Sequence, residues 1–553
     1  MVILGRLFYL EVIASERLQK KAIDQWTREL PLKASRGKIL SSNGTALATN
    51  KSSYAVYIRT RQVKNPERVA SVLSQIFGVD EQKLLDKMRK KATSEITVKR
   101  QVDKESIVKL TNYQLDGVYY SVDNTRLYPY NQLLCSVLGY SSIDGGGQTG
   151  LELYYDKYLK GVDGEVLYES DLTGQDIKDK TPSYTPAVNG LNVVTTIDIG
   201  IQQVVEAALE KAYKTYTPKG CSAVVLDPQT GRVLAMANLP SFDLNAPPRN
   251  DIATLNALSR NTLVVDCYEP GSTFKVVTAL ANVNQALKGD KSAKSLDYIY
   301  SSNRYRELAG GRIKCWSDHK NGKHSNQTLA LALNNSCNPC FTDIALSLGT
   351  KTFYSYITAL GFGKKTGIDF PGEASGVIIP ENSVKIGDLA RIGFGQSVSV
   401  TPIQLAAAVS AAVNGGNYYK PYIVDKITTE DGRLVESFSP TLKGQVATIK
   451  ASAILAGYLE DVVTSGSGKN AYIEGYKIGG KTGTAQKFVD GKIAQGKYVM
   501  SFVGFMPSNK PEYLCLVIVD EPVGGNYGST VAAPVAGQIF KGIIDLKDIE
   551  LII

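Results

Sequence analysis

The chain has 553 residues, which is too many for one hydrophobic core, so two or three domains are expected. Hydrophobic residues make up 43% and charged residues 21%, as in an ordinary globular protein. The net charge of +9 is spread along the chain, which suits an anionic partner such as a membrane surface or an acidic polymer. No basic stripe interleaved with aromatic residues is present, and this argues against a nucleic-acid partner.

The N-terminal stretch MVILGRLFYLEVIAS is apolar but interrupted by Arg6. It is shorter than the ~20 residues that a membrane span needs. It also lacks the basic start and small-residue cleavage site of a signal peptide. We therefore expect residues 1–13 to be the remnant of a membrane-anchor helix whose beginning is missing, with a short buried helix as the alternative.

Residues 14–188 are expected to form a first, elongated α+β domain. Asn43-Gly44 between alternating apolar residues predicts a hairpin. Residues 66–93 have helical periodicity. Residues 117–140 and 143–190 are rich in Gly, Tyr and Asp, which indicates strands and loops.

The pattern changes near Gly190, and residues 189–553 are expected to form a second domain. A strand is followed by Asp198, a predicted helix cap, and by an amphipathic helix. A hairpin is predicted around the turn 227–231. Helices are expected at 272–286, 327–336, 340–349, 403–413 and 449–464, with strands following them. Helices in the middle and strands at both ends predict an α+β fold, in which an antiparallel sheet carries helices on both faces.

Three short motifs carry chemistry. In EPGSTFK, a helix is predicted to begin near Ser272, which places Lys275 on the same face of its first turn. A serine needs a base to act as a nucleophile, and a buried lysine can supply one. The helix N-terminus would also provide N–H groups for a developing oxyanion.

The other two motifs are Ser336-Cys337-Asn338 and Lys481-Thr482-Gly483-Thr484. A hydroxyl and an amide two residues apart can point into one cavity. A lysine, hydroxyls and a glycine on an edge strand can hold an extended peptide and its terminal carboxylate. Each motif alone is weak evidence, but their order along the chain is informative.

Ser-x-x-Lys, Ser-x-Asn and Lys-Thr-Gly in this order resemble the serine penicillin-interacting enzymes. The whole chain resembles class B penicillin-binding proteins of the sporulation and division types. RGKILSSNGTALA, GQTGLELYYDKYLKGVDG and IGFGQSVSVTPIQLAAA are similar to further segments of that family. The first of these departs from the family at Ser41, where Asp is usual.

The resemblance implies a D,D-transpeptidase that cross-links peptidoglycan stem peptides through an acyl-serine at D-Ala-D-Ala and is inhibited by β-lactams. It implies Ser272 as nucleophile, Lys275 as base, Ser336 as proton relay and Asn338 as a substrate-backbone ligand. It also implies carboxylate binding by Lys481, Thr482 and Thr484 beside Gly483. The N–H groups of Ser272 and Thr484 would form the oxyanion hole.

The expected partners are stem peptides on lipid-linked precursor strands, β-lactams, the membrane through the missing anchor, and a membrane glycosyltransferase. The expected location is the cell membrane, single-pass, with the catalytic domain outside the cytoplasm or between spore membranes. No cofactor is expected to be required for catalysis.

Other functions remain as alternatives. A D,D-carboxypeptidase, a β-lactamase-like relative and a penicillin sensor or inactive scaffold could carry the same motifs. A Ser-His-Asp hydrolase would need an imidazole beside its serine, and the only histidines are His319 and His324.

A structural zinc site is a further hypothesis, because residues 315–340 concentrate soft ligands. The preferred ligands are Cys315, Asp318, His324 and Cys340, with free thiols or a disulfide as alternatives. The remaining cysteines lie singly in apolar surroundings and are expected to be buried structural thiols: Cys135, Cys221, Cys267 and Cys515.

Overall fold

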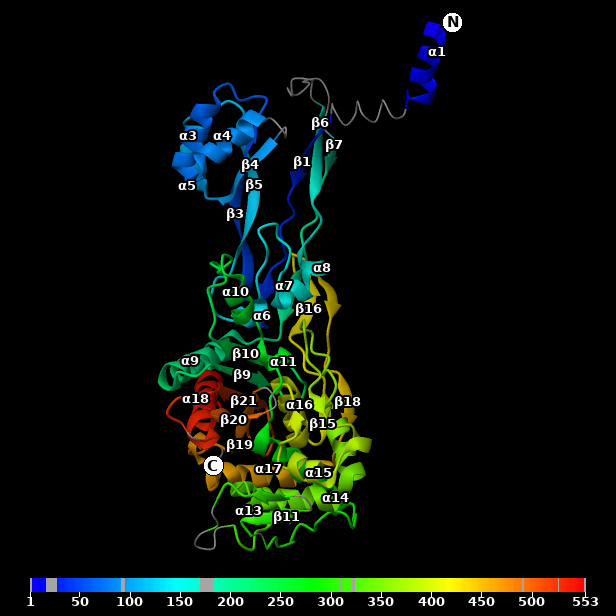
Figure 1. Cartoon of the computed structure of the whole chain (residues 1–553), viewed down its shortest axis with the longest axis vertical. Helices are drawn as coiled ribbons and strands as arrows, with labels where there is room; N and C mark the ends of the chain where they lie inside the picture. The colour runs from blue at the N-terminus through cyan, green and yellow to red at the C-terminus, as the bar shows by residue number, and fades with distance from the viewer. Residues whose placement is uncertain are drawn as a thin grey trace.

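The structure is a computed structural model, and it describes residues 2–15, 27–90, 95–169, 183–301, 303–308, 311–317, 319, 324–489, 492–525 and 527–551. The molecule is elongated, with a small head at one end and a large globular domain at the other (Figure 1). The N-terminal residues form α1 (Val2–Phe8) and the π-helical turn η1 (Tyr9–Ile13). Within the described residues, no helix combines the length and the hydropathy that crossing a bilayer requires.

The head packs three helices against a twisted sheet. The strands are β3 (Ala46–Arg59), β4 (Glu95–Val102) and β5 (Val118–Leu127), and both β4 and β5 pair antiparallel with β3. The helices are α3 (Pro66–Phe77), α4 (Glu81–Lys90) and α5 (Lys104–Thr111). Helix α3 begins where the Asn65 side chain accepts the Arg68 N–H, and ends at Gly78 in the left-handed conformation.

A stem below the head contains a second small sheet of β1 (Thr27–Leu32), β6 (Gly164–Glu169) and β7 (Ser183–Thr185). It also contains the short helices α6 (Cys135–Leu138), α7 (Gly150–Tyr154) and α8 (Asp156–Leu159). The stem is stabilised by a buried ionic cluster, in which Glu152 accepts hydrogen bonds from Arg36 Nε and Arg126 Nε, both at 2.7 Å. Both buried guanidinium groups therefore have a carboxylate partner.

A mixed sheet joins the stem to the large domain. It contains β2 (Ile39–Leu40), β8 (Asn192–Thr195), β16 (Val424–Thr428) and β17 (Leu434–Ser437), and it continues into β3 and β4 of the head. Strands β2 and β8 pair in parallel, and the other pairs are antiparallel. The domain boundary at 188/189 stays a prediction, because this sheet crosses it.

The large domain is built on a five-stranded antiparallel sheet in the order β10-β9-β21-β20-β19. The strands are β9 (Gly220–Leu226), β10 (Val233–Leu239), β19 (Gly479–Val489), β20 (Lys492–Met506) and β21 (Tyr513–Asp520). Alternate residues of β9 enter two separate cores: Ala223 and Val225 face one, and Val224 and Leu226 the other. The sheet is therefore buried on both faces.

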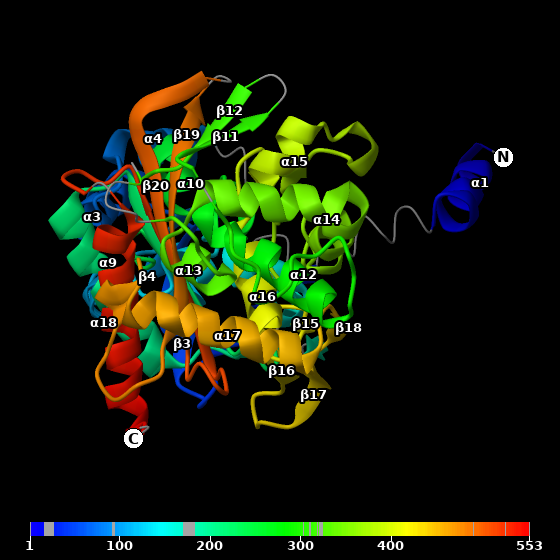
Figure 2. The same ribbon diagram turned by 90° about the horizontal axis from the view of Figure 1, so that it is seen from below.

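Helices α9 (Ile199–Tyr216) and α18 (Gly528–Lys547) cover one face of this sheet. On the other face lie α11 (Thr262–Val265), the 3-10 turn η2 (Gly271–Phe274), α12 (Lys275–Leu287) and α16 (Pro402–Val413). Seen from below, α12 lies among α14 (Asn338–Ala359), α16 and α17 (Ile449–Thr464) (Figure 2). The predicted α+β fold, with helices on both sheet faces and an elongated N-terminal domain, is confirmed.

The remaining elements are short and surround this core. The helices are α10 (Ile252–Leu258), α13 (Leu329–Asn334), η4 (Glu381–Ser383), α15 (Ile386–Ile392) and η5 (Lys469–Ala471). The strands are β11 (Tyr305–Leu308), β12 (Gly311–Lys314), β13 (Val377–Ile378), β14 (Val398–Ser399), β15 (Asn417–Tyr419) and β18 (Leu442–Gln445).

Candidate active site

Ser272 lies in the turn η2, directly before α12. Gly271 has a φ of +53°, which lets the chain turn sharply into the helix. Lys275 is the first residue of α12 and is fully buried. Its Nζ lies 3.1 Å from the Oγ of Ser272. The predicted pairing of an amine with a hydroxyl at a helix N-terminus is therefore present.

Lys275 also reaches the connection between α13 and α14. Its ammonium donates to the Ser336 carbonyl at 2.7 Å and to Asn338 Oδ1 at 2.7 Å, and it lies 3.1 Å from Ser336 Oγ. Burial lowers the pKa of Lys275 to about 8, although the neighbouring thiols of Cys315, Cys337 and Cys340 act in the opposite direction. A neutral amine is thus accessible near physiological pH.

Ser336 lies between two buried lysines. Its Oγ accepts from Lys481 Nζ at 3.0 Å and faces Lys275 from the other side. The residue has a φ of +52°, which is an uncommon conformation for serine. Its side chain lies between Lys275 of α12 and Lys481 of β19. Burial, and then the positive charge of Lys275, hold the pKa of Lys481 well below its usual range. The two amines and one hydroxyl can pass protons among themselves.

Strand β19 is the edge of the five-stranded sheet and carries the third motif. Gly483 packs so closely that a Cβ there would lie 2.4 Å from Ser501 Oγ and 3.1 Å from the Pro270 carbonyl. Thr484 Oγ1 accepts the Gly528 N–H at 2.9 Å, so its proton stays available for a ligand. An exposed strand edge beside these groups can pair with an extended peptide.

Four soft ligands gather behind Asn338. The ligand atoms of Cys315, His319, His324 and Cys337 all lie within 4.8 Å of one another. Cys315 Sγ is 3.5 Å from His324 Nδ1 and 3.9 Å from Cys337 Sγ. Both ring nitrogens of His319 are buried, and neither has a hydrogen-bond partner among the residues that the structure describes. This donor set, with an unsatisfied imidazole, fits a tetrahedral metal site.

The predicted zinc ligands agree with this group only in part. Cys315 and His324 belong to it. Asp318 lies outside the described residues, and Cys340 accepts a hydrogen bond from Gln327 Nε2 at 3.5 Å and is not a member. Cys337 and His319 join instead, because the loop folds back on the helix end, and no sequence pattern favoured them over the predicted pair.

Two parts of the chain match known protein families. Residues 221–541 match the penicillin binding protein transpeptidase domain, and residues 31–195 match the penicillin-binding protein dimerisation domain. The chain belongs to the class B penicillin-binding proteins. Stage V sporulation protein D of Bacillus subtilis is 40% identical to it, over 98% of this chain and 83% of that protein.

Other members of the family cover the chain to a similar extent. The peptidoglycan D,D-transpeptidase FtsI of Escherichia coli is 27% identical over 99% of this chain and 90% of its own length. A peptidoglycan synthetase of Bifidobacterium adolescentis has a crystal structure with a TM-score of 0.75 and 25% identity, covering 95% of this chain and 97% of that one. Penicillin binding protein 3 of Mycobacterium tuberculosis, complexed with aztreonam, has a TM-score of 0.72, 24% identity and coverages of 94% and 98%, which supports the fold.

In this penicillin-binding protein, residues outside the three motifs also contact the site: Ser467, Trp316 and Tyr527. Thr482 Oγ1 donates to Ser467 Oγ at 3.2 Å, and the indole of Trp316 donates to the Asn335 carbonyl at 2.9 Å. The Trp316 ring meets the exposed Tyr527 ring edge-on, with centroids 6.2 Å apart. These residues come from separate loops, so only the folded chain brings them to the site.

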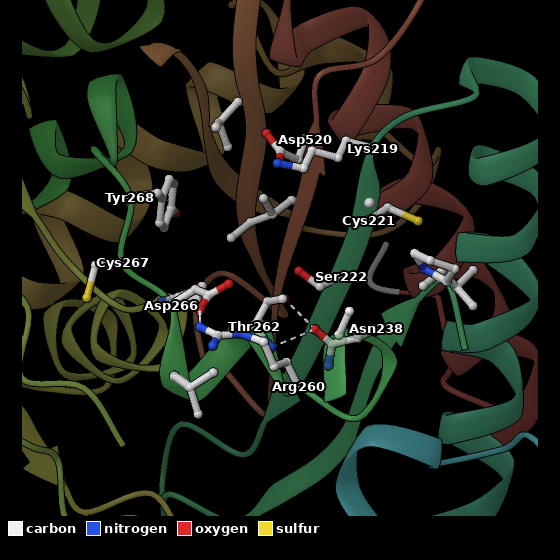
Figure 3. Close-up of a pocket in the computed structure, with 18 of the residues that line it drawn as sticks. Lys219, Cys221, Ser222, Asn238, Arg260, Thr262, Asp266, Cys267, Tyr268 and Asp520 are labelled. Carbon is white, nitrogen blue, oxygen red and sulfur yellow. Dashed lines mark hydrogen bonds and ion pairs between the residues drawn. The ribbon is translucent and has the colours of Figure 1, made fainter. Parts of the chain in front are cut away.

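The expectation for the isolated cysteines is partly wrong. Cys135, Cys221 and Cys515 are buried, as predicted, whereas Cys267 is exposed. Cys267 follows α11 in the extended segment that leads to Ser272 and lies at the rim of a cavity (Figure 3). Apolar neighbours in the sequence did not reveal this, because Val264 is buried in the core while Val265 and Tyr268 line the same cavity as Cys267.

Proposed function

We propose that this protein is a serine-type peptidoglycan D,D-transpeptidase. The observation that carries the proposal is the contact of 3.1 Å between the fully buried Lys275 amine and the Ser272 hydroxyl. Neutral Lys275 accepts the Ser272 proton as Oγ attacks the carbonyl carbon of the penultimate D-Ala. The backbone N–H groups of Ser272 and Thr484 stabilise the negative charge on the carbonyl oxygen.

The acyl-enzyme forms when the C–N bond to the terminal D-Ala breaks. The leaving amine takes a proton relayed from Lys275 through Ser336, which contacts both lysines. Lys481, Thr482 and Thr484 hold the terminal carboxylate, with Gly483 allowing the close approach of the peptide, while Asn338 holds the substrate backbone. The amine of a second stem peptide then attacks the ester carbon, forms the cross-link and releases Ser272.

Labelling with a fluorescent penicillin tests the nucleophile. The wild-type protein should take up one equivalent and release it slowly, whereas Ser272→Ala should take up none. Equal labelling of both proteins would refute the assignment of Ser272. Rapid multiple turnover of the β-lactam would instead favour the β-lactamase-like alternative.

The choice between transpeptidation and hydrolysis needs a second assay. With a D-Ala-D-Ala peptide and an acceptor amine, we expect a cross-linked product that outweighs the hydrolysed one. Release of D-Ala at the same rate without the amine would favour a D,D-carboxypeptidase.

We also propose that a zinc ion stabilises the loop behind Asn338, bound by Cys315, His319, His324 and Cys337. Support comes from the two thiols and two imidazoles within 4.8 Å of one another. With four protein ligands such a site is structural, because no open position remains for water. Bound zinc would fix the backbone on both sides of Cys337, and hence Ser336 and Asn338.

Elemental analysis of the purified protein should find about one equivalent of zinc. Cys337→Ser should lose it, whereas Cys340→Ser should retain it. The reverse result would restore the set predicted from the sequence, which includes Asp318 and Cys340. Less than a tenth of an equivalent in the wild-type protein would reject zinc.

Finally, we propose that the protein is anchored in the cell membrane by its N-terminal segment and acts outside the cytoplasm with a membrane glycosyltransferase. The apolar N-terminal helix and the family membership support this. Fractionation of cells that express the natural gene, with protease added to intact protoplasts, tests it. Recovery of the protein in the cytoplasmic fraction would contradict the proposal.

A further inference from the structure

The cavity that Cys267 lines is on the same face of the five-stranded sheet as Ser272. It has a volume of about 660 Å³ and lies between the start of β9, the end of β21, the middle of β20 and the segment 257–268 (Figure 3). This volume is within the range of sites that bind small molecules. None of the three motifs contributes a side chain to it.

The walls of the cavity are mainly apolar. They include side chains from the sheet, from α11 and from the start of α16: Leu239, Val265, Pro402, Val499 and Ile518. Asn238 is polar but already engaged, because its Oδ1 accepts the Thr262 N–H and its Nδ2 donates to Ser136 Oγ at 2.9 Å. An apolar ligand body would therefore meet few unsatisfied groups on these walls.

Ser222 is the exception. It lies on β9 with only 4% of its surface exposed, and it lines the cavity. Figure 3 shows this hydroxyl directed into the cavity, between Asp266 and Asn238. A hydroxyl that faces a cavity and makes no hydrogen bond within the protein can donate to a ligand or to water. Ser222 therefore marks a position for a polar ligand atom.

The charges around the cavity leave one cation unbalanced. Arg260 pairs with Asp266. Lys487 and Lys497 balance Asp520 and Glu521. Lys219 also lines the cavity, is exposed, and forms no ion pair with any residue that the structure describes. A single anionic group on a ligand would be attracted to it.

We propose that this cavity is an effector site for a small molecule with an apolar body and one carboxylate. The apolar body lies against Leu239, Val499 and Ile518. The carboxylate is held by Lys219, and a polar atom of the ligand accepts the proton of Ser222.

The wall of the cavity continues into the catalytic turn. Tyr268 lines the cavity and pairs with Val400 through N–H···O bonds of 3.0 and 2.9 Å, four residues before Ser272. The Gly271 N–H donates to the Gly395 carbonyl at 3.0 Å. Proton transfer from Ser272 depends on its contact of 3.1 Å with Lys275. A ligand that displaces this wall also moves Ser272, lengthens that contact and slows acylation. This second step rests on the proposed function, whereas binding does not.

Biphenyl-4-ylacetate is a suitable probe, since it has an apolar body and one carboxylate, and its neutral amide is the matched control ligand. We expect calorimetry to show binding of the acid and about tenfold weaker binding of the amide. Lys219→Met should weaken binding of the acid about tenfold, and Lys214→Met, an exposed lysine of α9 away from the cavity, should leave it unchanged. Equal binding of acid and amide, or no binding of the acid to the wild-type protein, would overturn the site.

Coupling to Ser272 is measured separately. At saturating probe, we expect the rate of acylation by a fluorescent penicillin to fall at least threefold in the wild-type protein. At the same probe concentration, Lys219→Met should be slowed much less. Binding without a change in rate would overturn the effector role while leaving the ligand site intact. A protein that binds the probe but is never acylated would count against the proposed function alone.

Discussion

Ser336 accepts hydrogen bonds on a hydroxyl that two buried amines share, and this determines how charge is distributed in the active site. Burial penalises the charged form of both amines and lowers the pKa of Lys275. Burial, and then the positive charge of Lys275, lower the pKa of Lys481. A neutral amine is therefore available as a base, and a carboxylate placed beside Lys481 would favour the charged form of that lysine.

The pH dependence of acylation tests the role of Lys275. Only its neutral form can accept the Ser272 proton, so the rate should rise with pH and level off above a pKa of about 8. An unperturbed lysine would level off only above about 10.4. Stopped-flow measurements with a chromogenic β-lactam between pH 6 and 10 provide the profile. A rate that does not change across this range would contradict the assignment.

Replacing the base should be more damaging than replacing a neighbouring lysine. Lys275→Arg keeps the positive charge but cannot lose its proton, so acylation should slow by about 10²–10⁴-fold. Lys288→Arg, at the exposed C-terminal end of the same helix, should acylate as the wild type does. Comparable losses in the two variants would indicate a folding defect rather than the loss of a base.

At the scale of elements, the active site depends on how closely η2 packs against β19. Ser272 stands over the strand because neither Gly271 nor Gly483 has a side chain to separate them. The N-terminus of α18 approaches from the opposite face, where a Cβ on Gly528 would lie 2.1 Å from the Gly483 carbonyl. The edge strand is thus held between a turn and a helix end, with its outer edge left to the substrate.

Gly483→Ala should therefore disturb both stability and activity. The added methyl group has no space beside Ser501 and Pro270, and overpacking of this kind costs about 1–3 kcal/mol. Chemical denaturation and penicillin labelling would measure the two effects. Gly444→Ala on β18 is the matched control, since no atom lies within 4 Å of the position that its methyl group would occupy. A surface change of this kind stays within about 0.5 kcal/mol.

The bounds of many helices could be predicted from the sequence. Helix α17 has the predicted bounds 449–464, and α16 differs from its prediction by one residue, because caps and apolar periodicity are local signals. Helix α14 was predicted to end at 349 but continues to Ala359, since Gly349 only interrupts it with a φ of +72°. The meeting of His319 with Cys337, and the contact of Thr482 with Ser467, could not be predicted. They depend on loop closure between distant segments, which no periodicity records.

At the scale of the whole molecule, one continuous sheet connects the head, the stem and the large domain. Its order, β17-β16-β8-β2-β3-β4, brings strands of both family domains into a single hydrogen-bonded layer. The stem adds a second connection, in which the Tyr155 hydroxyl donates to the buried Asp369 at 2.7 Å. The shared sheet and this buried contact therefore fix the orientation of the two parts.

Glu152→Gln tests the contribution of the ionic cluster in the stem. Removing the carboxylate leaves Arg36 and Arg126 buried without its negative charge, so we expect a loss of about 3–5 kcal/mol in the unfolding of the stem. Asp163→Asn, which breaks the exposed pair with Lys33, should cost less than about 1 kcal/mol. Hydrogen exchange would show whether the loss is confined to the stem, and equal protection in both variants would contradict it.

Strand β3 has 14 residues, and these pair first with β2 beside the large domain and then with β4 and β5 in the head. An extended strand of this length spans about 46 Å. Because the strand is shared, the head cannot swing without breaking ladder hydrogen bonds. Strand β3 thus fixes the distance between the head and the domain that carries Ser272.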